Sequence, residues 1–264
     1  MTRANRADEE GYDRFMGRWS RTLAVRFVQF VAVRGGDAIL DVGSGTGALA
    51  AAVAAAAPSC RLTGVDAAPS QVAIARTRQA GSHARFEVGD AQRLRFVDRR
   101  FDRALSLLAL NFVPDPVRAL DEMIRVTKRG GTIAAAVWDY GRDMEMLRVF
   151  WDEATALNPA AAARDERHMP LCRCGELAAL WRDRRLTETC EAAITIPMSF
   201  ASFDDYWSPF LEGEGPAGAY VATLAPGERD ALRLRLRRRF LGEGADGPIG
   251  LDARAWAVRG RRAS

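Results

Sequence analysis

Lysine is almost absent from this chain, in which Lys128 is the only lysine among 38 basic residues. The other basic residues are arginines, and with 34 acidic residues the formal net charge at pH 7 is +4. A positive charge permits a nucleic-acid partner. However, a uniform preference for arginine, together with abundant alanine, is typical of a codon bias across a whole genome. The charge by itself therefore does not predict a phosphate-binding surface.

Residues that bind metals or form disulfides are also scarce. The chain has two histidines and four cysteines, and no two cysteines have the CxxC spacing. This density does not match a disulfide framework, and so few ligands do not favour a structural zinc site. We therefore expect no bound metal.

Long apolar runs are missing as well. The longest alanine-rich stretch, Ala48 to Ala57, is shorter than the roughly 18 residues that a membrane-spanning helix needs. The first residues, MTRANRADEE, are polar and include acidic groups, unlike a secretory signal. With 48% hydrophobic and 27% charged residues the composition is that of a globular protein. We expect a cytoplasmic enzyme without a membrane span.

Short β-rich runs alternate with helical segments over the first half of the chain. Helical composition separates them at Ala48 to Ala56, Gln71 to Gln79 and Pro116 to Thr127. This alternation predicts βαβ units and a parallel sheet. The five runs are 38–42, 62–65, 86–88, 101–107 and 131–138.

The pattern loosens after Trp138. Two further strands are predicted, at Cys190 to Ile196 and Ile249 to Val258, with about 50 residues between them. The segments around them are helical, apart from a loop at Glu212 to Gly218 that is rich in proline and glycine. A helical insertion between the last two strands follows from this spacing.

A glycine-rich turn joins the first strand to the first helix. Gly43, Gly45 and Ala48 fit the dinucleotide pattern G-x-G-x-x-G/A, and Asp66 ends the next strand, where a carboxylate accepts from ribose hydroxyls. Glycines let the backbone approach a ligand closely, and a helix N-terminus favours anions. A nicotinamide or flavin oxidoreductase is therefore one open interpretation.

Two more acidic residues favour a different ligand. Asp41 lies two residues before Gly43, where a dinucleotide fold ordinarily has a small or apolar residue, and its carboxylate can attract an ammonium group. Asp90 follows the third strand in VGDA and can accept from an exocyclic adenine amine. A ligand with an ammonium, a ribose and an adenine but no pyrophosphate is S-adenosylmethionine.

The chain from about Ala38 to Trp138 resembles the class I S-adenosylmethionine-dependent methyltransferases of the small-molecule type, similar to the ubiquinone and menaquinone methyltransferase group. The resemblance rests on ILDVGSGTG, GVDAAPSQVAIAR, FEVGDAQRLRF, FDRALSLLALNFVPDP and RVTKRGGTIAAAVWD, in the family's order and spacing. Upstream, YDRFMGRWS at Tyr12 to Ser20 resembles the lead-in helix of related enzymes. The resemblance implies a doubly wound, Rossmann-like α/β fold with seven mostly parallel strands, an antiparallel last strand and helical lid insertions.

The resemblance also implies which residues hold the methionine part of the cofactor. Asp41 and the backbone of Gly43 and Gly45 would bind it, and Leu107 would offer its backbone to the ammonium. Arg18 is our candidate for the methionine carboxylate, although an exposed arginine on a helix is the simpler interpretation.

The adenosine part has its own set of residues by the same resemblance. Asp66 would accept from both ribose hydroxyls, and Ala67 would lie against the adenine face. Asp90 would accept from the adenine amine, and the Ala91 N–H would donate to a ring nitrogen. S-adenosylhomocysteine would be the product.

The acceptor and the catalytic residues are not defined by the sequence. Asn111 stands where many relatives have histidine, and His83 is expected on the surface. His168 is the only histidine that could lie near an acceptor, although this is the less favoured interpretation. A small, partly apolar acceptor methylated at oxygen or carbon is the leading hypothesis. The alternatives are an NAD(P)-dependent oxidoreductase and a cofactor-binding protein without transfer activity.

Two other features bear on partners. The run Arg233 to Arg239 falls in a helix whose Leu232, Leu236 and Phe240 share one face, so its arginines are expected in solvent and no nucleic-acid partner is predicted. The aromatic residues of 203–210 can form core or pocket lining. The sequence gives no indication of the oligomeric state.

The expected organisation has five parts. They are a lead-in or lid at 1–37, a cofactor-binding core at 38–140, an insertion with a helix and the sixth strand at 141–200, a substrate-side helical insertion at 201–247, and the final strand at 248–264.

Overall fold

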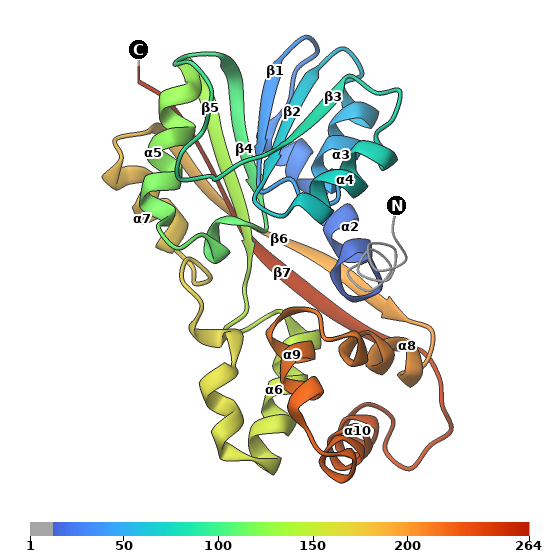
Figure 1. Ribbon diagram of the computed structural model, residues 1–264. Coiled ribbons are helices and arrows are strands. Elements are labelled where there is room, and N and C mark those ends of the chain that lie inside the picture. The colour runs from blue at the N-terminus through green and yellow to red at the C-terminus, as the bar shows by residue number, and fades with distance from the viewer. Residues whose placement is uncertain (1–12, 264) are drawn as a thin grey trace. The chain divides into compact units, whose positions relative to one another are not determined.

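A seven-stranded sheet runs through the structure, a computed structural model that describes residues 13–263. Tyr12, the first residue of the expected lead-in motif, lies outside these residues. The strands follow the order β3-β2-β1-β4-β5-β7-β6 (Figure 1). Their bounds are β1 Ala38–Val42, β2 Arg61–Asp66, β3 Ala84–Val88, β4 Phe101–Leu107, β5 Thr127–Trp138, β6 Thr187–Phe200 and β7 Ile249–Arg261.

The first five strands are parallel, and β7 is antiparallel to β5. The predicted Rossmann-like sheet of seven mostly parallel strands with an antiparallel last strand is confirmed. Both faces of the central strands are covered, as expected of a parallel sheet: every residue of β5 from Ile133 to Trp138 is buried. The β7 position also separates this sheet from the dinucleotide fold, whose six strands follow the order 3-2-1-4-5-6.

Helices cover the two faces of the sheet, as right-handed crossovers require. The strand order moves outward from β1 through β2 to β3, but in the opposite direction from β1 through β4 to β5. Helices α3 Ala48–Ala56 and α4 Pro69–Arg78 therefore lie on one face, and α5 Pro116–Val126 lies on the other (Figure 1). The strand order reverses between β1 and β4, and sheets of this kind bind ligands at the carboxyl ends of the strands on either side of such a reversal.

The chain divides into two compact units, each described here by itself. Unit 2 comprises residues 19–138, 170–194 and 255–263, and so contains β1 to β5 and the paired part of β7. It also includes most of α2 Arg18–Val31, an amphipathic helix that buries Leu23, Phe27 and Val31, and α7 Glu176–Asp183. Nearly all cofactor-binding candidates fall in this unit.

Unit 1 comprises residues 13–18, 139–169 and 195–254, and it is mainly helical. Its core is aromatic: the Phe150 ring stacks on Phe210 at 4.6 Å between centroids, and Tyr206 is fully buried. Its helical segments are η1 Asp13–Gly17, α6 Glu145–Leu157, η3 Pro159–Arg164, η4 Glu166–His168, α8 Phe203–Trp207, η5 Ser208–Glu212, α9 Gly215–Thr223 and α10 Pro226–Leu241.

One expectation about unit 1 was wrong in detail. The loop expected at Glu212 to Gly218 ends early, because α9 begins at Gly215 with Pro216 in its first turn, where a missing N–H costs nothing. Residues 203–211 are helical, as expected of the segments around the last two strands, and α8 is followed directly by η5 at Ser208, next to Pro209. Across residues 13–263, no helix combines the length and hydropathy needed to cross a bilayer.

Candidate cofactor site

Eight of the nine predicted cofactor residues lie in unit 2, at or just beyond the carboxyl ends of four neighbouring strands. Asp41 is in β1, and Gly43 and Gly45 follow it. Asp66 ends β2 and Leu107 ends β4, while Asp90 follows β3. Since β1 to β4 are adjacent and parallel, the fold brings these residues to one edge of the sheet.

The glycine-rich turn has a backbone that other residues rarely adopt. Gly43, Gly45 and Gly47 have φ angles of 76°, 49° and 90°, in the left-handed region. A Cβ on Gly43 would lie 2.1 Å from the Cβ of Ala109, far inside van der Waals contact. The turn thus passes directly beside the segment that follows β4, and only glycine fits there.

Asp66 connects this turn to the next strand. Its Oδ2 accepts a hydrogen bond from the Gly45 N–H at 2.9 Å, and its Oδ1 accepts one from the Ala68 N–H at 2.9 Å. The side chain is partly exposed, so its carboxylate keeps lone pairs for further donors. If Asp66 served only to cap helix α4, the bond to Gly45 would have no explanation.

Asp41 is the most unusual titratable group of the turn. It is 1% exposed, and neither carboxylate oxygen has a hydrogen-bond partner among the described residues. Burial, and next the charge of Asp66, raise the pKa of Asp41 from 3.8 to about 8. An unpaired buried carboxylate is costly unless a cation or donor compensates it. The structure thus provides an acceptor for a cation that the described residues do not supply.

Further buried polar atoms near this turn have no hydrogen-bond partner within the part of the chain that the structure describes. They include the Ser44 hydroxyl inside the turn and the Ser106 hydroxyl in β4. The Gln71 side-chain oxygen is another, and it lies 4.0 Å from where a Gly45 Cβ would be. Our sequence reasoning missed all three residues. The position of Ser44 between two glycines of the turn was the one signal that could have indicated it.

The adenosine residues differ in exposure. Asp90 is exposed, and its Oδ1 accepts from the Gln92 backbone at 2.8 Å, a hydrogen bond that holds the pKa of Asp90 below its ordinary value. Ala67 is exposed and Ala91 is partly buried. Beyond β4, Leu107 is followed by Leu108 with a φ of 60°, a turn that redirects the backbone at the strand end.

Arg18 belongs to unit 1, unlike the other candidates. Its guanidinium donates to both carboxylate oxygens of Asp205 at 3.1 Å and lies 4.7 Å from the centre of the Phe200 ring. Arg18 is therefore not the exposed arginine of the simpler interpretation, because its side chain is partly buried and has an acidic partner. Its role toward a methionine carboxylate stays a prediction.

Unit 1 also contains a buried carboxyl group that sequence reasoning missed. Glu166 is 4% exposed and accepts a hydrogen bond from the Trp151 indole at 2.6 Å. Burial raises the pKa of Glu166 from 4.5 to about 7. His168 is exposed, and so is His83 of unit 2, as expected. No set of three or more potential ligand side chains gathers around a metal position within residues 13–263.

Comparison with known proteins is consistent with this geometry. Residues 40–135 match the model of a methyltransferase domain. The ubiquinone/menaquinone biosynthesis C-methyltransferase of Bdellovibrio bacteriovorus is 32% identical over 110 residues, which are 41% of this chain and 47% of that protein. The chain spans about half the length of the curated relatives it matches.

Two solved structures extend the likeness of the fold to almost the whole chain. The YcgJ protein of Bacillus subtilis has a TM-score of 0.59 at 20% identity, covering 94% of this chain and 99% of that one. A phosphoethanolamine N-methyltransferase of Haemonchus contortus, in complex with phosphomonomethylethanolamine and S-adenosylhomocysteine, has a TM-score of 0.59 at 14% identity, covering 96% of this chain and 56% of that one.

The strand order, the glycine turn and the matched residues together define the class. Residues 40–135 form a methyltransferase domain that is similar to the ubiquinone/menaquinone methyltransferase group, which confirms the resemblance of this region to the class I S-adenosylmethionine-dependent methyltransferases inferred from the motifs.

Proposed function

We propose that this protein transfers a methyl group from S-adenosylmethionine to oxygen or carbon of a small, partly apolar acceptor. The observation that carries the proposal is Asp41, a buried carboxyl group with both oxygens unpartnered beside a turn that only glycine can form. A dinucleotide would present phosphates to this turn, and their negative charge would further disfavour the ionised form of Asp41. An ammonium group, by contrast, compensates it.

The residues of unit 2 suit the parts of the cofactor in order. Asp41 would compensate the ammonium, and the backbone of Gly43, Gly45 and Leu107 would bind the methionine chain. Asp66, already held by two backbone donors, would accept from the ribose hydroxyls. Asp90 would accept from the adenine amine, with Ala67 and Ala91 beside the base.

When bound, S-adenosylmethionine supplies an electrophilic methyl group on a sulfonium, and S-adenosylhomocysteine leaves as a neutral thioether. The task of the chain is to hold donor and acceptor in line and to exclude water, which can supply several kcal/mol of acceleration. No catalytic side chain is assigned. The proposed acceptor is therefore a group that is already nucleophilic, such as a phenolate or a stabilised carbanion.

Calorimetric titration of the full chain with S-adenosylhomocysteine, S-adenosylmethionine and NAD(P) tests the donor. We expect saturable binding of the first two and none of NAD(P), and loss of binding in Asp41→Leu. Tight NAD(P) binding without an S-adenosylmethionine signal would establish the oxidoreductase alternative instead.

A panel of phenolic, quinol and amine acceptors tests the transfer step, with S-adenosylhomocysteine release as the measurement. Turnover restricted to acceptors with a nucleophilic oxygen or carbon supports the proposal, and turnover restricted to amines contradicts the proposed atom type. Cofactor binding without turnover on any acceptor would favour the third alternative, a binding protein that has no transfer activity.

A further inference from the structure

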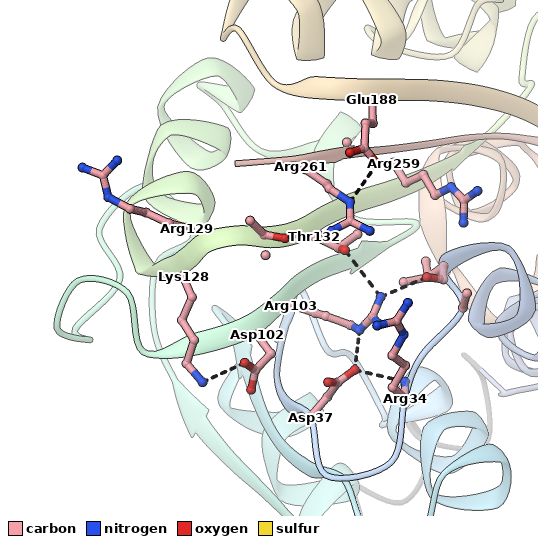
Figure 2. A pocket seen from close by; sticks show the side chains of 15 residues that line it. Arg34, Asp37, Asp102, Arg103, Lys128, Arg129, Thr132, Glu188, Arg259 and Arg261 are labelled. Atoms are coloured by element: carbon pink, nitrogen blue, oxygen red, sulfur yellow. Dashed lines mark hydrogen bonds and ion pairs between the residues drawn. The ribbon is translucent and has the colours of Figure 1, made fainter. Parts of the chain in front are cut away.

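A pocket of about 470 Å³ lies in unit 2 at the opposite edge of the sheet from the proposed cofactor site. It is lined at the amino ends of β1 and β4 by Asp37, Asp102 and Arg103, at the start of β5 by 128–132, and at the end of β7 by 259–261 (Figure 2). The volume falls in the range of small-molecule sites, roughly 300 to 1,000 Å³.

The lining of this pocket is strongly basic. Val31 and Ala32 are its only lining residues with an aliphatic side chain, so it does not suit an apolar ligand. Six basic side chains line it against three acidic ones, so the lining has a formal excess of three positive charges, and such an excess attracts anions. The basic residues are Arg34, Arg103, Lys128, Arg129, Arg259 and Arg261, and the acidic ones are Asp37, Asp102 and Glu188.

Each acidic residue is already paired with one of the basic ones. Asp37 forms an ion pair with Arg103. Asp102 accepts from the Lys128 ammonium at 2.7 Å, and Glu188 pairs with Arg261 at 2.8 Å. These three pairs cancel in charge, and Figure 2 shows them around the pocket.

Three arginines are therefore left without a countercharge. Arg34, Arg129 and Arg259 form no ion pair with any residue between 13 and 263. They come from three separate segments: the loop before β1, the start of β5, and β7. An anion with a single charge cannot neutralise all three, whereas a polyanion carries enough charge to do so.

The protein also holds part of this basic set in place. The Arg259 guanidinium donates to the Phe30 carbonyl at 2.7 Å and lies 5.2 Å from the centre of the Phe30 ring. Arg103 is buried and donates to the Val31 carbonyl at 3.0 Å. Arginines that are fixed before binding lose less entropy when they engage an anion.

We propose that this pocket binds a small molecule through a chain of two or three phosphate groups. Guanidinium groups match phosphate oxygens in geometry and charge. The three uncompensated arginines suit the charge of such a chain. The phosphates can belong to inorganic pyrophosphate or to a nucleoside di- or triphosphate, because both present the same group.

Calorimetry on the full chain, with S-adenosylhomocysteine already bound at saturation, isolates this pocket from the proposed cofactor site. The probes are inorganic pyrophosphate, ATP and inorganic phosphate, each at constant ionic strength. We expect one saturable site for pyrophosphate or ATP and at least about tenfold weaker binding of inorganic phosphate. ATP binding more tightly than pyrophosphate would identify a nucleotide as the source, and equal affinity would identify the phosphates alone.

Three variants, each of which removes one positive charge, distinguish a specific binding site from non-specific electrostatic attraction. Arg34→Gln and Arg259→Gln are expected to weaken pyrophosphate binding roughly tenfold or more, since each removes a charged hydrogen-bond donor. Arg85→Gln, on the exposed face of β3 and outside the pocket, is the matched control and should leave binding unchanged. If Arg259→Gln does not fold, Arg34→Gln decides alone, because its side chain is exposed.

The proposal is overturned if no saturable binding occurs, or if Arg85→Gln weakens binding as much as Arg34→Gln. It is also overturned if a single-stranded oligonucleotide binds in a manner dependent on Arg34 while pyrophosphate and ATP do not. In that case the pocket would be part of a nucleic-acid surface.

Discussion

The Gly45 N–H donates a 2.9 Å hydrogen bond to Oδ2 of Asp66, so the turn after β1 is fastened to the end of β2. The same carboxylate accepts from Ala68 through its other oxygen. A residue that is proposed to bind ribose is thereby oriented before the ligand arrives, and it helps to shape the turn that binds the methionine end. The two halves of the proposed site are coupled through this one side chain.

Replacing Asp66 with alanine should affect both ligand and fold. We expect S-adenosylhomocysteine binding to weaken by about 1 to 3 kcal/mol, since ribose hydroxyls and the Gly45 N–H would both lose an acceptor. Calorimetry measures the affinity and thermal unfolding the stability. Glu87→Ala, an exposed acidic residue on the neighbouring β3, is the control and should change neither. Unchanged affinity in Asp66→Ala would mean that the ribose binds elsewhere.

Asp90→Ala should separate affinity from stability. The side chain is exposed, and within residues 13–263 it accepts hydrogen bonds from Gln92 in its own turn. Binding of S-adenosylhomocysteine should weaken by about 1 to 3 kcal/mol, while the melting temperature of the free protein stays within about 2 °C of wild type. A variant that binds normally would remove Asp90 from the adenine site.

Asp41→Asn should stabilise the free protein at high pH and abolish cofactor binding. With a folded pKa of about 8 and an ordinary value of 3.8, the folded protein binds more protons than the unfolded chain between these two pH values. The contribution of Asp41 to stability therefore falls as pH rises, by up to about 1.4 kcal/mol per pH unit. Thermal unfolding at pH 5 and pH 8 should show that the stability of the variant relative to wild type is greater at pH 8 than at pH 5. An equal difference at both pH values would contradict the raised pKa.

Cofactor binding near pH 7 should release close to one proton in the wild type. Asp41 is mainly protonated in the free protein at that pH, and an ammonium group beside it favours the ionised form. Titrating S-adenosylhomocysteine in two buffers of different ionisation enthalpy measures the released protons. Glu87→Gln should behave as wild type. Binding that moves no protons would show that the ammonium does not approach Asp41.

Gly43→Ala and Gly81→Ala compare a close contact with backbone strain alone. Both glycines have a left-handed φ, 76° and 85°. A Cβ at position 43 would lie 2.1 Å from Ala109, whereas a Cβ at position 81 would meet nothing within 4 Å. We expect Gly81→Ala to lower the free energy of unfolding by about 1 kcal/mol and Gly43→Ala to lower it by more. Gly43→Ala should also lose cofactor binding. Chemical denaturation measures the free energy of unfolding of both variants. Equal losses in the two variants would contradict the close approach of the turn to Ala109.

Much of the sheet was predictable because each strand carries its own local signal. The predicted bounds of Ala38–Val42 and Phe101–Leu107 agree with β1 and β4, since apolar runs between turns identify buried strands. The start of α9 at Gly215 was not predictable, because glycine and proline in sequence are typical of loops. The orphaned hydroxyls of Ser44 and Ser106 also needed the structure, because burial beside a ligand site has no signature in the chain.

The sequence by itself determined the class of the domain. It places three acidic residues at strand ends around a glycine-rich turn, and a parallel sheet brings the carboxyl ends of neighbouring strands to one edge. Only the tertiary structure decided the states of these groups, because a pKa depends on burial and on neighbours distant in sequence. It made Asp41 a buried acid with a pKa of about 8, fixed Asp66 between two backbone donors, and paired Arg18 with Asp205. It also gathered arginines from three segments around one pocket, among residues that in sequence reflect only a compositional bias.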